Sequence, residues 1–306
     1  MSLVQSYSSR PPTLQNASPP FLTKIVNSIE KNGNIVLGID PDLNRIPNCF
    51  NQSHRIEATL ELYCRELLTA AAENVAAVKF QSACFEQYGL LGMVALSNSL
   101  SYARQLNYII ILDAKRGDIA ETNQCYAQAY LDDSNKADSF LVDAITVSPW
   151  LGIDALQPFI NSAKQYGKGL FLVLRSSNPG SDSVQNFTGH NLKLSEYIIN
   201  CFLEFFGNES ALSQVIGFVV GATLPDESEQ LRRYLPESVF LVPGMGAQGG
   251  LCNRKQAFWG KFSSRTLFPL SRSLTLMNKD VSRNEFNHVI AKRLSDYREQ
   301  LAEVRL

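Results

Sequence analysis

The sequence has 306 residues, of which 45% are hydrophobic, and it carries 28 basic and 29 acidic side chains. A chain of this length and composition can form one large α/β domain with a sizeable core. The balanced charge gives no support for a surface that binds nucleic acid or an anionic membrane. No apolar run reaches the roughly 18 residues that a membrane-spanning helix needs.

Six scattered cysteines form no C-x-x-C pair. We therefore expect neither a zinc site nor a disulfide framework, and we expect a reducing, cytoplasmic compartment. Residues 1–20 are rich in serine and proline and lack an apolar signal core. They predict a flexible N-terminal arm, with a transit peptide as the alternative.

From Phe21 onward, helical and strand-like segments alternate. Helical periodicity predicts one helix that begins at Phe21 and stops within residues 31–34, and further helices over about residues 54–73, 86–104, 121–134, 192–206 and 280–304. Eight apolar runs predict buried strands: Ile35–Ile39, Val75–Val78, Tyr108–Leu112, Phe140–Val147, Gly169–Leu174, Val215–Val220, Val239–Val242 and Thr266–Leu270.

Strands that alternate with helices are typical of a parallel sheet, and eight such units predict a (β/α)8 TIM barrel. The barrel would form a single domain over residues 21–306, with an extra C-terminal helix. No G-x-G-x-x-G motif follows the first strand, so a dinucleotide-binding fold is the weaker interpretation.

Charged side chains gather after the third predicted strand, at Asp113, Lys115 and Asp118. Alternation along a strand places Asp113 and Lys115 on one face, and a turn can bring Asp118 back toward Lys115. This predicts one ammonium between two carboxylates at the C-terminal end of a strand, where α/β proteins place active sites. A solvated ion pair is the alternative. The preceding run, Tyr108–Leu112, favours the buried interpretation because it is apolar without alternation.

Other strand ends also carry candidate groups. Asp40 follows the first strand and Lys79 the second, although a turn residue and a snorkelling lysine are the alternatives. The glycine-rich segment Pro243–Gly250, which contains Gln248, predicts a nest of backbone N–H groups for an anion, with tight-turn chemistry as the alternative. Arg272 would add a forked cation at the last strand end, and barrels often bind phosphate between these two loops.

The motif D-A-K-R-G-D-I at Asp113–Ile119 resembles the signature of the orotidine 5′-phosphate decarboxylase family. Supporting matches follow in family order over about residues 21–278. They are Gly38–Pro41, Val78–Phe80, Glu121–Asn123, Ser177–Gly180, Pro243–Gly250 and Ser271–Ser273. The length, and the segment S-P-W-L-G after the fourth strand, resemble the longer bacterial (type 2) subgroup.

This resemblance implies decarboxylation of orotidine 5′-phosphate to UMP and CO2, the last step of de novo pyrimidine synthesis, with no cofactor and no metal. Lys115 would stabilise the carbanion at C6 and then protonate it. Asp113 and Lys79 would complete the charged array. Asp118 would join the array from the partner subunit of a homodimer, with Thr122 near the ribose.

The resemblance also assigns substrate-binding groups. Asp40 and Lys79 would hold ribose hydroxyls, and Ser177 would read the pyrimidine. The phosphate would bind Gln248, Arg272 and the backbone of the glycine loop at Gly246, with Pro243 lining the site. The segment Leu251–Pro269 is irregular for this family, which leaves Arg254 and Arg265 as alternatives to Arg272.

Two other functions stay open from the residues. The first is a Mg2+-dependent sister enzyme of the superfamily, a keto-gulonate phosphate decarboxylase or hexulose phosphate synthase, which shares D-x-K-x-x-D. Arg116-Gly117 and Ser177-Asn178 favour the nucleotide enzyme. The second is a non-catalytic barrel that binds a nucleotide phosphate and has no need of the charged array.

Overall fold

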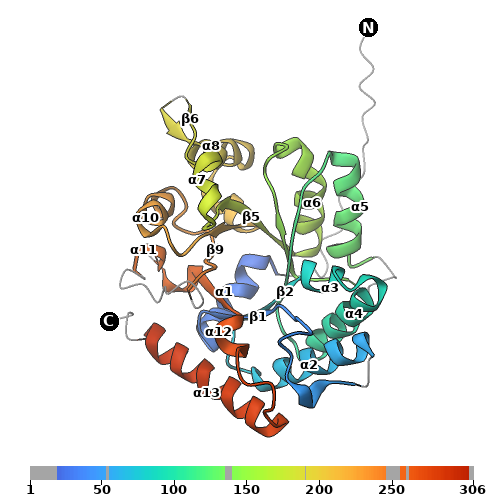
Figure 1. Ribbon diagram of the computed structural model, residues 1–306. Helices are drawn as coiled ribbons and strands as arrows, with labels where there is room; N and C mark the ends of the chain where they lie inside the picture. Colours follow the sequence, from blue (N-terminus) through green and yellow to red (C-terminus); the bar gives the residue numbers. More distant parts are fainter. Residues whose placement is uncertain are drawn as a thin grey trace.

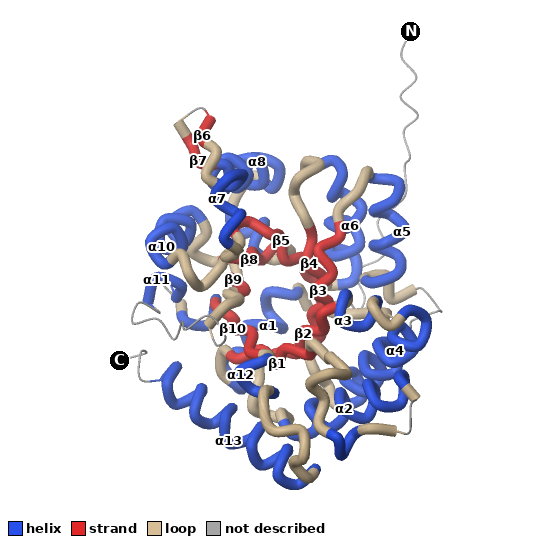
Figure 2. Tube along the Cα trace, viewed as in Figure 1, coloured by secondary structure: helices blue, strands red, loops and turns tan. Residues whose placement is uncertain are grey.

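A computed structural model describes residues 19–52, 55–134, 140–189, 191–245, 256–259 and 262–302, except for the side chains of residues 256 and 257. Eight parallel strands close a barrel in the order β1-β10-β9-β8-β5-β4-β3-β2, which confirms the predicted fold. Figure 2 shows these strands as a ring, with α1 visible through its centre and most other helices around it. The barrel strands are β1 Ile35–Ile39, β2 Ala77–Gln81, β3 Ile110–Arg116, β4 Ala144–Val147, β5 Gly169–Arg175, β8 Ile216–Val220, β9 Phe240–Leu241 and β10 Thr266–Leu270.

The longer helices pack outside the barrel, and short helices and turns join them to the strands (Figure 1). The helices are α1 Phe21–Asn32, α2 Ile56–Ala70, α3 Ala83–Glu86, α4 Gly89–Gln105, α5 Ala120–Tyr130, α6 Ile153–Tyr166, α7 Asp182–Gln185, α8 Leu194–Phe206, α9 Glu209–Ser213, α10 Pro225–Tyr234, α11 Gln256–Trp259, α12 Arg272–Thr275 and α13 Arg283–Ala302. Three 3-10 turns, η1 Asn48–Phe50, η2 Pro179–Ser181 and η3 Ser263–Arg265, and a hairpin, β6 Thr188–Gly189 with β7 Leu192–Lys193, complete the described elements.

Several predicted boundaries were wrong. The second strand was predicted at Val75–Val78 but runs from Ala77 to Gln81, and the third continues past Leu112 to Arg116. Lys79, Asp113 and Lys115 therefore lie within the last residues of these strands rather than after them. The fourth strand starts at Ala144 rather than Phe140. The apolar residues before Ala144 were predicted to belong to the strand, but they precede it, and Val142 is buried without belonging to the sheet.

Helix α1 closes the N-terminal end of the barrel. Its buried face, which includes Phe21, Ile25 and Ile29, packs with the side chains inside the barrel. The Phe21 ring meets Phe171 edge to face at 5.8 Å between centroids, and a Cβ on Gly169 would lie only 2.2 Å from the Phe21 ring. This plug leaves the C-terminal end of the barrel as the open end.

The predicted C-terminal helix is present as α13, and it lies outside the barrel. Phe286 on this helix packs on Phe50 and Tyr63, with ring centroids 4.9 and 5.8 Å apart. None of the helices in the described ranges combines the length and apolar character needed to cross a bilayer. Residues 1–18 lie outside the described residues, so the N-terminal arm stays a prediction.

Candidate active site

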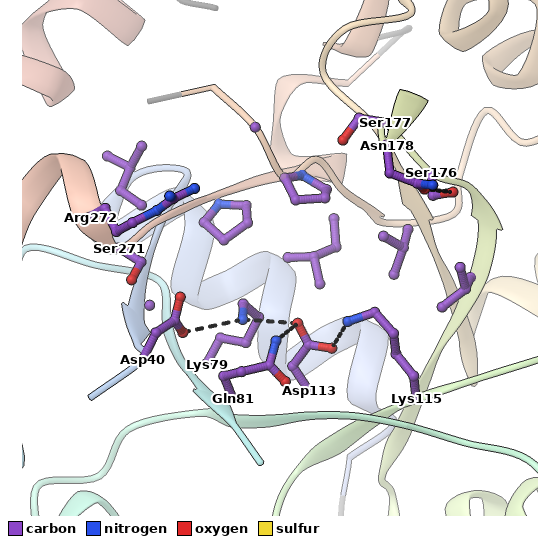
Figure 3. A pocket seen from close by; sticks show the side chains of 18 of the residues that line it. Asp40, Lys79, Gln81, Asp113, Lys115, Ser176, Ser177, Asn178, Ser271 and Arg272 are labelled. Atoms are coloured by element: carbon purple, nitrogen blue, oxygen red, sulfur yellow. Dashed lines mark hydrogen bonds and ion pairs between the residues drawn. The ribbon is translucent and has the colours of Figure 1, made fainter. Parts of the chain in front are cut away.

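A pocket of about 340 Å³ opens at the C-terminal ends of the strands. Figure 3 shows side chains from opposite sides of the barrel converging on it. Four of the predicted polar side chains, Asp40, Lys79, Asp113 and Lys115, lie on its β1–β3 side, and Ser177, Pro243 and Arg272 line the remainder. The sequence therefore predicted correctly that these groups meet in one cavity.

Asp113 is the centre of a charged array. Its Oδ2 accepts a hydrogen bond from Lys79 Nζ at 2.9 Å, and its Oδ1 accepts one from Lys115 Nζ at 2.6 Å. Asp40 Oδ1 lies 3.9 Å from Lys79 Nζ and accepts no hydrogen bond from any described residue. Positive and negative groups thus alternate from Asp40 to Lys115, as the dashed lines of Figure 3 show.

Burial and charge oppose each other at the centre of this array. Asp113 is 9% exposed and Lys79 is 7% exposed. Burial by itself would raise the pKa of Asp113, but the charges of Lys79 and Lys115 outweigh it and hold that pKa well below its ordinary value. Burial by itself would lower the pKa of Lys79, but Asp113 and Asp40 outweigh it and raise that pKa. Both groups are therefore ionised at neutral pH.

Lys115 differs from Lys79 because its side chain is 51% exposed and extends along the open pocket. Its φ of +46° is a left-handed conformation, and the register between β3 and β4 shifts between Leu112 and Arg116. Lys115 N donates to Thr146 Oγ1 at 2.8 Å, and that hydroxyl donates to Asp113 Oδ1 at 3.1 Å. A non-glycine residue in this region costs roughly 1–3 kcal/mol. The backbone is therefore strained at the residue that carries the exposed ammonium. The side chains at this end of β3 also do not follow the regular alternation of faces that was predicted from the sequence.

The predicted return of Asp118 toward Lys115 within one chain was wrong. Asp118 Oδ1 accepts from Ile119 N at 2.7 Å, and Asp118 forms no ion pair with another described residue. The reason is Asn123, a fully buried side chain. Its Oδ1 accepts from Asp118 N at 3.1 Å, and its Nδ2 donates to Asp118 O at 2.7 Å. These two hydrogen bonds hold the turn at Asp118 away from the pocket. Neither Asp118 nor Thr122, on α5, is among the residues that line it.

Of the two candidate phosphate arginines that the structure describes, only Arg272 lines the pocket. Arg272 begins α12, directly after β10, and lines the pocket. Arg265 lies in η3 before β10, at the opposite end of the barrel, so it does not reach the cavity. Gly246, Gln248 and Arg254 lie outside the described residues.

Pro269 does not disrupt β10, which spans the predicted Thr266–Leu270. The strand pairs with β1 through the register Val36↔Pro269, and Phe268 N donates to Asn34 O on the same side. Successive N–H groups of a strand point to opposite sides. The nitrogen of Pro269 therefore faces away from β1, beyond the residues that pair with the two-residue strand β9.

Sequence reasoning missed several pocket side chains. Gln81 lines the cavity, and its Nε2 donates to Asp113 Oδ2 at 3.3 Å. Thr146 is buried outside the lining and donates to the other oxygen of the same carboxylate. The signal for Gln81 was present, because it follows Lys79 by two residues on one strand. Ser176, Asn178, Ser271 and Ser273 also line the cavity.

With this geometry in place, comparison with known proteins identifies the family. The model of the orotidine 5′-phosphate decarboxylase / HUMPS family matches residues 34–254, which is most of the chain. The chain belongs to this family.

Individual members of the family match over nearly their full length. The orotidine 5′-phosphate decarboxylase of Caldicellulosiruptor bescii is 32% identical over 283 residues, 87% of this chain and 92% of the relative. That of Rhodopirellula baltica is 34% identical over 279 residues, 87% and 91% of the two chains. The solved structure of Leishmania donovani OMP decarboxylase has a TM-score of 0.74 at 26% identity and covers 94% of this chain and 99% of that one.

Proposed function

We propose that the chain decarboxylates orotidine 5′-phosphate to UMP and CO2, with no metal or cofactor, as the last step of de novo pyrimidine synthesis. The observation that carries the proposal is the array around Asp113. A single ionised carboxylate holds two lysines, and one of them, Lys115, projects into an open cavity. A fixed cation in such a cavity suits a reaction that leaves negative charge on carbon.

The pocket offers a distinct partner for each part of the nucleotide. Arg272 supplies a forked cation for the phosphate. Asp40 Oδ1, buried and without a hydrogen-bond donor among the described residues, can accept from a ribose hydroxyl. Ser177 and Asn178 lie across the pocket, where they can meet the base. Gln248 and Gly246 remain predicted phosphate contacts.

These positions imply a simple sequence of steps. When the bond between C6 and the carboxylate breaks, the electron pair stays on C6 and CO2 leaves. The ammonium of Lys115 stabilises that charge and then transfers a proton to C6, giving UMP. Asp113 keeps the ammonium in place throughout, because its lowered pKa keeps it ionised.

The proposal also includes a homodimer that shares Asp118 and Thr122 between sites. Asp118 forms no ion pair within the described chain, and Ile119, Trp150 and Leu151 expose large apolar side chains beside it. The two loop segments that carry these residues approach each other, since a Cβ on Gly117 would lie 3.1 Å from Ser148 Cβ. A second copy would cover this surface and bring its own Asp118 to the pocket.

The activity is tested by following the loss of orotidine 5′-phosphate absorbance in the presence of EDTA. We expect turnover at an undiminished rate after chelation. Turnover of a sugar phosphate that requires added Mg2+ would instead favour the sister enzymes. No turnover in any buffer, with nucleotide still bound, would favour the binding-only barrel.

The shared site is tested by subunit exchange. Lys115→Ala and Asp118→Ala should each be inactive alone, but a heterodimer of the two retains one complete site. Random exchange should therefore restore about a quarter of wild-type activity. A mixture that stays inactive although sedimentation shows heterodimers would mean that Asp118 serves its own chain or no site.

A further inference from the structure

Arg175, at the end of β5, is the largest of the almost completely buried side chains among the described residues, with 1% exposure. All of its guanidinium nitrogens are engaged. Nε donates to Glu227 Oε2 at 2.7 Å, Nη2 donates to Asp182 Oδ1 at 2.5 Å, and Nη1 donates to Ser181 Oγ at 2.8 Å and Gln185 Oε1 at 3.1 Å. Burying a guanidinium costs desolvation free energy, so the ion pairs of Arg175 are unlike those of an exposed surface arginine and point to a specific role.

These partners join parts of the chain that are distant in sequence. Asp182, Ser181 and Gln185 belong to the insertion between β5 and α8, which projects beyond the barrel with α7 and β6 (Figure 1). Glu227 belongs to α10, which follows β8. Its second oxygen, Oε1, lies 3.4 Å from Lys193 Nζ at the far end of the insertion. Arg175 and Glu227 therefore connect both ends of the insertion to the barrel wall.

A short relay runs from Arg175 to the pocket. Gln185 Oε1 accepts from both Arg175 and Ser176 N, the latter at 2.9 Å, and Gln185 Nε2 donates to Ser176 Oγ at 2.9 Å. Ser176 Oγ then donates to Asn178 Oδ1 at 2.8 Å. Ser176, Ser177 and Asn178 all line the cavity (Figure 3).

The same segment packs directly on the neighbouring strand end. A Cβ on Gly221 would lie 2.7 Å from Ser177 Cβ and 2.9 Å from Ser177 N. Gly221 N also donates to Arg175 O at 2.8 Å. Only glycine at position 221 permits the two backbones to come this close. Ser177 is therefore held by the end of β8 on one side and by the hydrogen bonds from Arg175 through Gln185 and Ser176 on the other.

We infer that Arg175 is a positioning residue that, together with Glu227, orients residues 176–178 and thereby controls recognition of the pyrimidine base. This inference rests on the proposed function, in which the base lies against these residues. The groups for phosphate and ribose, Arg272 and Asp40, come from α12 and the end of β1. No hydrogen bond or ion pair joins Arg175 to either of them in the described structure. Substitutions of Arg175 should therefore weaken binding of the base and leave binding of the ribose phosphate unchanged.

The test compares dissociation constants for UMP and for ribose 5-phosphate, which lacks the base. Arg175→Gln should weaken UMP binding roughly tenfold and change ribose 5-phosphate binding less than about twofold. Arg175→Lys should share much of this defect, because a single ammonium cannot serve the diverging acceptors. Glu227→Gln should act in the same direction, and the double variant should be no worse than Arg175→Gln.

Controls keep the outcomes distinct. Arg233→Gln removes an exposed arginine on the same helix as Glu227, paired with Glu229 at 3.4 Å, and should leave both constants unchanged. Equal weakening of both ligands, or unchanged UMP binding in Arg175→Lys and Glu227→Gln, would overturn the inference while wild-type turnover stands. A wild-type protein that neither turns over orotidine 5′-phosphate nor binds UMP would overturn the proposed function and the inference with it.

Discussion

Replacing Lys115 with alanine should lower kcat on the order of 10⁴-fold or more, while UMP still binds with a dissociation constant near that of the wild type. Two losses combine in this variant, since the same ammonium stabilises charge at C6 and supplies the proton. Binding persists because the groups for phosphate and ribose, Arg272 and Asp40, are untouched. Single-turnover rates and calorimetry with UMP measure the two effects separately.

The positive φ of Lys115 requires a second variant. Alanine disfavours a φ of +46°, whereas glycine accepts it, so Lys115→Gly removes the amine without that strain. If the missing amine, rather than backbone strain, causes the loss, both variants should lose turnover to the same extent. Lys292→Ala, which alters an exposed lysine of α13, should retain full activity. A near-normal rate in either Lys115 variant would refute the assigned role.

Asp113→Asn should lower the free energy of unfolding by roughly 3–5 kcal/mol, because it leaves the buried ammonium of Lys79 without the carboxylate that it donates to. Lys79 then keeps only Asp40, at 3.9 Å, as a partner within the buried array. Turnover should fall as well, since Lys115 loses the group that holds its ammonium at 2.6 Å. Urea denaturation measures the stability change, and Glu229→Gln, in an exposed pair, should change it by less than about 1 kcal/mol.

The same carboxylate predicts a response to acid. Its pKa in the folded protein is below the ordinary 3.8, so its stabilising contribution is complete above that pH. The contribution declines as the pH falls further toward the lower folded-state pKa, because the unfolded chain takes up the proton first. In that window the stability of Asp113→Asn should fall less steeply than that of the wild type, by about 1.4 kcal/mol per pH unit. Equal slopes would mean that Asp113 is not held ionised by the two lysines.

Much of the fold could be predicted because it depends on patterns local to the sequence. The strands at Ile35–Ile39 and Thr266–Leu270 were placed to the residue, since continuous apolar runs between turns identify buried strands. Helices α6 and α10 were missed. In α10 the described burial involves Ser228, Leu231 and Arg232, so only one apolar residue marks its inner face.

The candidate site was predicted in composition but not in geometry. The motif around Asp113 and Lys115 named the charged residues, and the barrel topology brought Asp40 and Lys79 beside them, since β1, β2 and β3 are adjacent. The burial of Asn123, which turns Asp118 away, depends on its contact with Ala155 O at 2.7 Å, and Ala155 is far along the chain. No local pattern reveals such a contact.

The sequence by itself determined the barrel, the identity of the charged array and its place at the strand ends, because hydrophobic periodicity and residue spacing act over short stretches of chain. Only the tertiary structure decided that Lys79 is buried while Lys115 reaches into the cavity, that Asp118 faces away, and that Arg175 connects two distant segments. Burial and long-range pairing arise when strands and loops pack together, so they are properties of the assembled barrel rather than of any segment.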